Sequence, residues 1–211
     1  MTRSGPRSTA GAASHSLLPA TRDITAAVCQ RLEKIDGDHP DEAVRWWTRK
    51  VQSVVDSVLD LPREGFTRSG RLSGWDPEFL VDMAITRDEP GADRNDCLGY
   101  QQLCLAMESE WSAGRADREY DFTKLADIRA ERKLFVGAAR SRKDHSLECE
   151  VARLRGFWGR HRGVTVNEEV GLILIDYVTG CWHSWVIVKN GEGRSESVPV
   201  RPTSSPGSNC P

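Results

Sequence analysis

Three carboxylates lie in two neighbouring apolar segments of the sequence. Asp82 falls within EFLVDMAIT (residues 78–86), and Glu108 and Glu110 fall near the end of LCLAMESEW (residues 103–111). Carboxylates that meet in a fold repel one another, which raises their pKa values unless a cation lies between them. Carboxylate oxygens suit Mg²⁺, an ion that keeps several of its waters and also binds substrate phosphate. The three acids are therefore candidate ligands of Mg²⁺ or Mn²⁺.

The alternation of residue types in both segments predicts β-strands and decides where the acids point. One face is expected to carry Phe79, Val81, Met83 and Ile85 of the first strand, and Leu103, Leu105, Met107, Ser109 and Trp111 of the second. The acids are expected on the other face, beside the small residues Ala84, Cys104 and Ala106. If the strands pair, the acids converge over a hollow. The alternative is the ordinary wet face of a half-buried sheet.

The other segments predict the elements that must position these strands. Apolar stripes predict helices over residues 22–36, 41–62 and 121–132, and a further helix that begins near residue 144 and ends at Gly156 or Gly159. Short apolar runs predict a strand over 133–139 and two strands within 169–190, joined near Thr179-Gly180, while 63–75 reads as a loop or edge strand and 112–120 as a loop. This order predicts an α/β domain with a mixed central sheet flanked by helices. Residues 21–190 are expected to form it, between a flexible tail (1–20) and a disordered tail (191–211).

Composition places limits on the partners and the compartment. The 211 residues are 38% hydrophobic and 28% charged, with a net charge of −2, which suits one domain and gives no global attraction to nucleic acid or membrane. No apolar run reaches the roughly 18 residues of a spanning helix, and the N-terminus lacks the apolar centre of a secretory signal. The six cysteines form no close pairs, which predicts reduced thiols and a cytoplasmic protein.

The pieces FLVDMAI, LAMESEW, DFTKL and KLFVG resemble the PD-(D/E)xK nuclease superfamily, which includes many restriction endonucleases. The resemblance implies a core of helix, three antiparallel strands, helix and strand over residues 40–138. It also implies a metal held between an Asp on the second strand and an acid-x-Lys motif on the third. Carried over by position, Asp82 and Glu108 would bind the metal, with the Ser109 carbonyl as a third ligand. The proline usual before the Asp is replaced by Val81.

Glu110 stands where the family usually has lysine. Some restriction enzymes of the superfamily use Glu-x-Glu, so Glu110 is expected to activate or orient the attacking water, although it could also mark a decayed site. Lys124 would return a positive charge to the pocket, or is an ordinary exposed lysine. Glu42 would add a metal-side acid, or stabilises a helix N-terminus.

The expected reaction is metal-dependent hydrolysis of phosphodiester bonds in nucleic acid, with DNA as the expected substrate and RNA left open. The alternative is a non-catalytic protein of the same fold that binds nucleic acid or another protein. The oligomeric state, monomer or homodimer, stays open.

Residues 138–163 are the most basic segment, with seven Lys or Arg against three acids, a local net charge of +4. Phe157 and Trp158 lie among the arginines, and Arg with aromatic side chains grips phosphates and stacks on bases. The candidate nucleic-acid-binding residues are Arg153, Arg155, Arg160 and Arg162. The alternative is a solvated helix face with both aromatic residues in the core. The stretch CWHSW (181–185) has one Cys-x-His pair and no second pair, which predicts a strand containing His183 rather than a zinc site.

Overall fold

The computed structural model describes residues 16, 18–35, 44–72, 80–88, 100–112, 114–140, 146–191 and 193–200. Seven strands form one sheet in chain order: β1 (Phe66–Ser69), β2 (Met83–Asp88), β3 (Tyr100–Glu110), β4 (Arg132–Ala139), β5 (Glu169–Asp176), β6 (Trp182–Lys189) and β7 (Ser195–Pro199). β1–β3 are antiparallel neighbours, β3–β5 are parallel, and β5–β7 are again antiparallel. The predicted α/β fold with a mixed sheet is confirmed.

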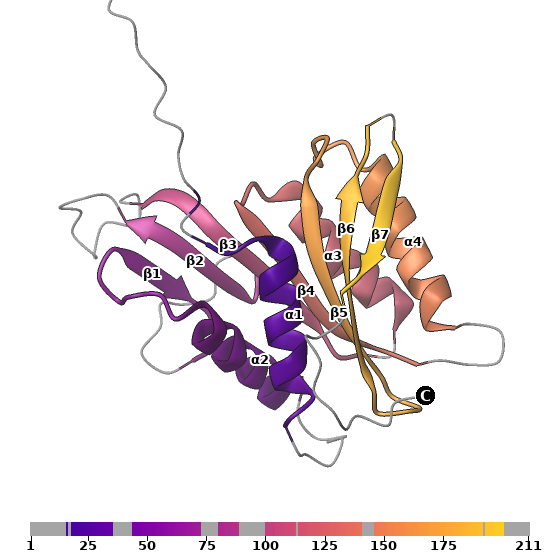
Figure 1. The fold of residues 1–211 in the computed structure, drawn as a ribbon, viewed down its shortest axis with the longest axis horizontal. Helices are drawn as coiled ribbons and strands as arrows, with labels where there is room; N and C mark the ends of the chain where they lie inside the picture. The colour runs from indigo at the N-terminus through magenta and orange to yellow at the C-terminus, as the bar shows by residue number, and fades with distance from the viewer. Residues whose placement is uncertain are drawn as a thin grey trace, which may run out of the picture.

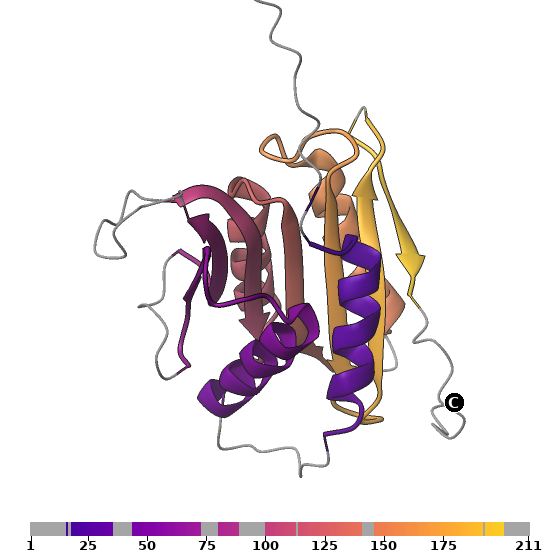
Figure 2. The ribbon, with the colours of Figure 1, turned by 60° about the vertical axis from the view of Figure 1, so that its left-hand side comes forward.

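Helices cover both faces of this sheet (Figure 1, Figure 2). α1 (Thr21–Leu32) and α2 (Val44–Leu59) lie on one face, and α3 (Arg115–Asp127) and α4 (Leu147–Arg160) lie on the other. Each face has its own apolar core. The first core buries the predicted stripes of α1 and α2 against Met83 and Met107, and the second buries Phe122 and Leu154 against Ala106 and Phe135.

The stretch from α2 to β4 has the order that the resemblance implied: a helix, three antiparallel strands, a helix and a strand. β4 runs parallel to β3, so the chain must cross back over the sheet between them, and α3 makes this crossing. The carboxyl ends of the parallel strands β3, β4 and β5 therefore meet at one edge, called here the carboxyl edge.

The strand alternation fails at two places. Val81 packs in the core under α3 and α4, whereas Met83 packs in the core under α1 and α2, so the prediction that they share a face is wrong. The reason is that the chain bends at residues 80–82, before β2 begins. In β3, Cys104 and Leu105 belong to the same core, at a shift in the β2–β3 register. An extra residue in one strand, a β-bulge, has this effect on alternation.

Two predicted boundaries also change. α3 begins at Arg115 rather than Asp121, so residues 115–120 are helical and not a loop; Asp117 in its first turn suits the positive end of the helix dipole. β7 pairs with β6 along its length, so the expected disordered tail is wrong for residues 193–200. At the other end, Leu18 is buried in the core, which shortens the expected N-terminal tail. Residues 1–15, 17 and 201–211 lie outside the described residues.

Within the described part of the chain, no helix is long and apolar enough to cross a membrane. Cys29, Cys104 and Cys149 are free thiols, whereas Cys181 is disulfide-bonded. The prediction of reduced cysteines is therefore wrong for Cys181.

Candidate active site

The Glu-Ser-Glu motif forms the last three residues of β3, at the carboxyl edge. Neighbouring elements hold the chain where it leaves this strand. Arg118 of α3 donates a hydrogen bond to the carbonyl of Ser112 (3.1 Å), and the Tyr177 hydroxyl, just after β5, donates to the carbonyl of Trp111 (2.9 Å). Residues 108–110 thus occupy a position fixed from both sides.

Asp82 lies directly before β2 and reaches across to β3. Its Oδ2 accepts hydrogen bonds from the Ser109 N–H (2.9 Å) and the Ser109 hydroxyl (2.7 Å), and its Oδ1 lies 3.6 Å from the Arg71 guanidinium. Gln52, buried in α2, holds the same turn because its amide donates to the Asp82 carbonyl and accepts from the Arg71 N–H (3.1 Å). Asp82 is therefore tied to β3 and to α2.

Glu108 is enclosed, with only 1% of its surface exposed. Its Oε1 is buried and lies 3.0 Å from the Lys124 ammonium, which forms an ion pair with it. Burial, and then the charge of Asp82, raise the pKa of Glu108 to about 8, although Lys124 opposes the shift. A carboxylate in this condition is stabilised by a cation brought next to it.

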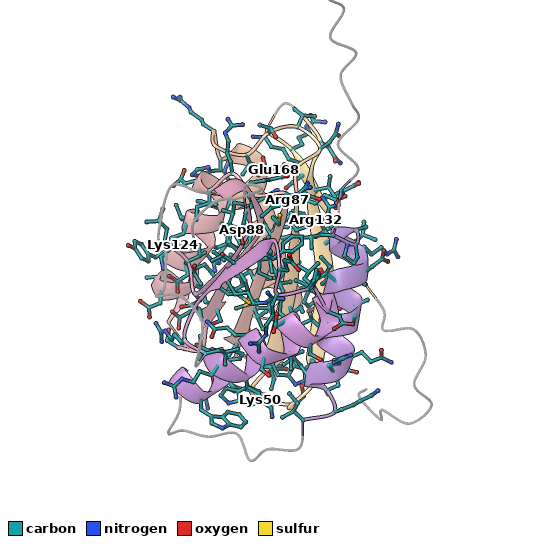
Figure 3. The ribbon with its side chains drawn as sticks, turned by 90° about the vertical axis from the view of Figure 1, so that its left-hand side faces the viewer. Lys50, Arg87, Asp88, Lys124, Arg132 and Glu168 are labelled. Atoms are coloured by element: carbon teal, nitrogen blue, oxygen red, sulfur yellow. The ribbon has the colours of Figure 1, made fainter. Side chains whose placement is uncertain are left out.

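Lys124 extends from α3 between two carboxylates. Its Nζ lies 2.8 Å from Asp121 Oδ1, three residues earlier on α3, as well as 3.0 Å from Glu108 Oε1. Burial alone would lower the pKa of Lys124, but the two acids raise it above its ordinary value. Figure 3 shows Lys124 on the α3 side of the sheet, apart from Lys50 of α2. Lys124 thus contacts the candidate metal ligand, and its catalytic role stays a prediction.

Glu110 joins the same group through Asp121. It is half-buried, accepts a hydrogen bond from the Ser112 N–H, and shares a side-chain hydrogen bond with Asp121. Burial raises its pKa and Asp121 adds to this shift, while the Ser112 N–H opposes it. Glu108 and Glu110 therefore both meet α3, as the alternation predicts. Asp82 lies directly before β2 and bonds to the Ser109 side chain, which faces Thr48 of α2, so the prediction that all three acids share one face is wrong for Asp82.

The donor types of the site are those that Mg²⁺ prefers, and metal binding stays a prediction. Asp82 and Glu108 offer two carboxylates. The Ser109 carbonyl points to the same strand edge as its N–H, toward Asp82, past the last pair of the β2–β3 ladder. Among the described residues, no three His, Cys, Asp or Glu side chains form a group that would hold an ion unaided. Mg²⁺ needs no such cage, because it uses one or two carboxylates together with waters and substrate phosphates.

The four candidate nucleic-acid-binding arginines differ from one another in burial and in partners. Arg153 is 14% exposed in its side chain and pairs with Glu119 of α3 and with Glu150. Arg155 is half-buried, and Arg160 and Arg162 are exposed. Because α4 returns from the carboxyl edge to the opposite edge, Arg160 lies about 20 Å along the helix from the edge that bears the acids. Arg153 is ion-paired within the fold, and the nucleic-acid role of all four arginines stays a prediction.

The aromatic residues of this segment belong to the core. Trp158 is fully buried, its indole N–H donates to the Glu168 carbonyl (3.1 Å), and Phe157 packs against the same core. Base stacking on Trp158 is therefore ruled out. His183 is a strand residue of β6, as predicted, and Glu42 lies outside the described residues.

The sequence patterns do not identify three residues of the site, Gln52, Arg71 and Asp121. Gln52 is recognisable in principle, because it is a polar residue within the apolar stripe of α2. Asp121 is also recognisable, because an acid and a lysine three apart on a helix face each other. Arg71 lies in a Gly- and Ser-rich stretch whose position no pattern predicts.

No protein-family model and no curated protein matches the sequence. Among solved structures, the chain is similar to the central domain of yeast acetyl-CoA carboxylase, with a TM-score of 0.35 and 9% identity. The match covers 89% of this chain and 29% of that chain, so the present chain spans less than a third of that structure. A TM-score this low carries no argument about function.

Proposed function

We propose that this protein is a metal-dependent nuclease that hydrolyses phosphodiester bonds, with DNA as its substrate. The observation that carries the proposal is the buried Glu108, which lies 3.0 Å from the Lys124 ammonium and whose pKa is raised by burial and by the charge of Asp82. Asp82 and Glu108 would hold Mg²⁺ or Mn²⁺, with the Ser109 carbonyl as a further ligand. The ion would polarise the phosphate and lower the pKa of bound water.

The chain's own residues would divide the remaining tasks. Glu110 would orient the attacking water and take its proton, because it is half-buried, has a raised pKa and lies at the end of the strand. Lys124 would meet the negative charge that develops on the phosphate, since its pKa is raised and it stays protonated.

A second candidate function is a non-catalytic binding protein of the same fold. One observation favours it: the two would-be metal ligands already face cations of the chain, Arg71 at Asp82 and Lys124 at Glu108. An ion-pair network of this kind can be purely structural.

Plasmid nicking separates the two candidates. We expect the parent protein to nick supercoiled plasmid with Mg²⁺ or Mn²⁺ and not in EDTA, and Asp82→Asn and Glu108→Gln to lose both nicking and calorimetric Mn²⁺ binding. Glu110→Gln should keep Mn²⁺ binding while turnover falls about 10²–10⁴-fold, the usual loss for a general base. Glu169→Gln, an exposed acid at the start of β5, is the matched control and should behave like the parent. A parent that neither binds Mn²⁺ nor nicks leaves the binding-protein candidate.

The partner and the compartment belong to the same proposal. A DNA duplex fits the exposed Arg160 and Arg162 as phosphate contacts, and a homodimer would allow two strands to be cut together. A cytoplasmic location agrees with the free thiols of Cys29, Cys104 and Cys149 and disagrees with the bonded Cys181.

A further inference from the structure

An ammonium group fills the space between two carboxylates on the α3 side of β3. Lys124 Nζ lies 3.0 Å from Glu108 Oε1 and 2.8 Å from Asp121 Oδ1. The side chains of Glu108 and Asp121 are 1% and 14% exposed, so both oxygens face inward. Glu108 Oε1 is itself a buried atom. The position is thus built for a cation, and the chain's own lysine supplies one.

The two contacts of this ammonium differ in how they are anchored. Asp121 and Lys124 are three residues apart on α3, so their ion pair is local to one helix. Glu108 belongs to β3 and cannot follow Lys124 if the lysine moves. Lysine is a compact charge on a flexible four-carbon stem, and 32% of this side chain is exposed. Lys124 can therefore leave Glu108 while it remains paired with Asp121.

We propose that Lys124 is an exchangeable counter-ion of Glu108, displaced when a divalent cation binds, and that Asp121 is the positioning residue that keeps Lys124 at the site. This inference rests on the proposed function and describes how cations exchange there. A divalent ion holds carboxylate oxygens at about 2.0–2.6 Å, and two cations at one buried carboxylate repel each other. The released ammonium, held by Asp121, then faces the substrate phosphate beside the ion.

Calorimetric titration with Mn²⁺ tests the exchange on the full-length protein after EDTA treatment. Lys124→Met should bind Mn²⁺ about tenfold more tightly than the parent, because a partly buried competing charge is gone. Arg115→Met is the matched control: it removes a cation from the same helix whose side chain is 63% exposed and pairs with Glu119, and its affinity should stay within about twofold. Binding by Lys124→Met that equals or falls below that of the parent overturns the exchange.

The positioning role of Asp121 is tested by plasmid nicking with Mn²⁺. Asp121→Asn should lower nicking about tenfold, and Asp121→Glu should restore most of it. In the Lys124→Met background, Asp121→Asn should add less than about a twofold loss, because Asp121 then has no lysine to position. A residue that is needed only for folding, or that acts through its hydrogen bond with Glu110, would lower nicking equally in both backgrounds, and that result would remove Asp121 from the proposal.

The results also separate this inference from the proposed function. A parent that nicks plasmid while Lys124→Met binds Mn²⁺ no more tightly removes the exchange and leaves the nuclease. Parent and Lys124→Met proteins that neither bind Mn²⁺ nor nick remove both. Mn²⁺ binding by Lys124→Met but not by the parent overturns the exchange, because Lys124 would then hold Glu108 against the metal instead of giving way to it.

Discussion

Glu108 couples the stability of the folded protein to pH. Its pKa is about 8 in the folded protein, against an ordinary value of 4.5. The folded state therefore favours the protonated acid, and this contribution is complete below about pH 4.5 and is lost as the pH rises through 8. Without metal, we expect the free energy of unfolding of the parent to fall by a few kcal/mol between pH 5 and 8.5, on the order of 1.4 kcal/mol per pKa unit. The melting temperature should fall with it.

Thermal melts in EDTA, recorded by circular dichroism across this range, measure the effect. Glu108→Gln keeps the shape of the side chain but cannot ionise, so its melting temperature should lack this component. Glu169→Gln removes an exposed acid and should follow the parent. Equal pH dependence in the parent and in Glu108→Gln would show that Glu108 is ionised at neutral pH in the folded protein.

The site residues differ in how far the sequence predicts them. Glu108 and Glu110 both meet α3 because side chains two residues apart on a strand lie on the same face of the sheet. Asp82 does not follow its own alternation, since the chain bends before β2 and the carboxylate turns toward Ser109. Asp121 meets Glu110 only because α3 packs on that face of β3, a tertiary arrangement that residue spacing does not contain.

The close approach of α4 to the β6–β7 connection depends on one glycine. A Cβ at Gly159 would lie 2.8 Å from the Gly193 carbonyl oxygen and 3.0 Å from the Ser195 nitrogen, and backbone atoms cannot move aside as a side chain can. Gly159→Ala should therefore lower the free energy of unfolding by about 1–3 kcal/mol through overpacking, although alanine is the better helix former. Urea denaturation measures this change.

Gly156 provides the control on the same helix. A Cβ there would meet the end of the flexible Arg160 side chain at 3.1 Å, which can swing away. Gly156→Ala should leave the free energy of unfolding unchanged or raise it by up to about 1 kcal/mol. The same loss in both variants would mean that the helix, and not its contact with the connection, is what alanine disturbs.

Sequence patterns predict the buried helices and strands well, and they predict the solvated edge strand and the helix boundaries poorly. The stripes of α1 and α2 and the apolar runs of β4, β5 and β6 appear where expected, because burial alone determines them. α4 continues past both glycines to Arg160, since they serve contacts rather than end the helix. β7 was missed because an edge strand of Ser, Glu, Val and Pro is mostly solvated and shows no apolar pattern.

The arginines between residues 153 and 162, in α4 and just after it, should divide into two classes when they are replaced. The double variant Arg160→Ala/Arg162→Ala should show a weaker salt dependence of DNA binding. The slope of log K against log salt should be smaller by about 1–2, because a phosphate contact that no longer forms no longer releases counterions. Its melting temperature should match that of the parent, because both side chains are exposed. Fluorescence anisotropy with a short duplex in EDTA measures the slope.

Arg153→Ala is the contrasting variant. It leaves Glu119 and the half-buried Glu150 with one cation fewer, so we expect a lower melting temperature and an unchanged salt slope. Burial alone would raise the pKa of Glu150, but Arg153 and Arg118 hold it below its usual value, so the pair supports folding at neutral pH. An unchanged slope in the Arg160/Arg162 variant would move the DNA contact to another surface.

The order of strands across the sheet is also their order along the chain, from β1 to β7. A ribosome delivers the chain from its N-terminus at about 5–20 residues per second. Each strand therefore emerges after the neighbour on which it docks, and none has to be inserted between two strands that are already paired. All the acids and the lysine of the candidate site lie before residue 128, so they leave the ribosome while β5, β6 and β7 are still untranslated. The sheet can grow cotranslationally by addition at a single advancing edge.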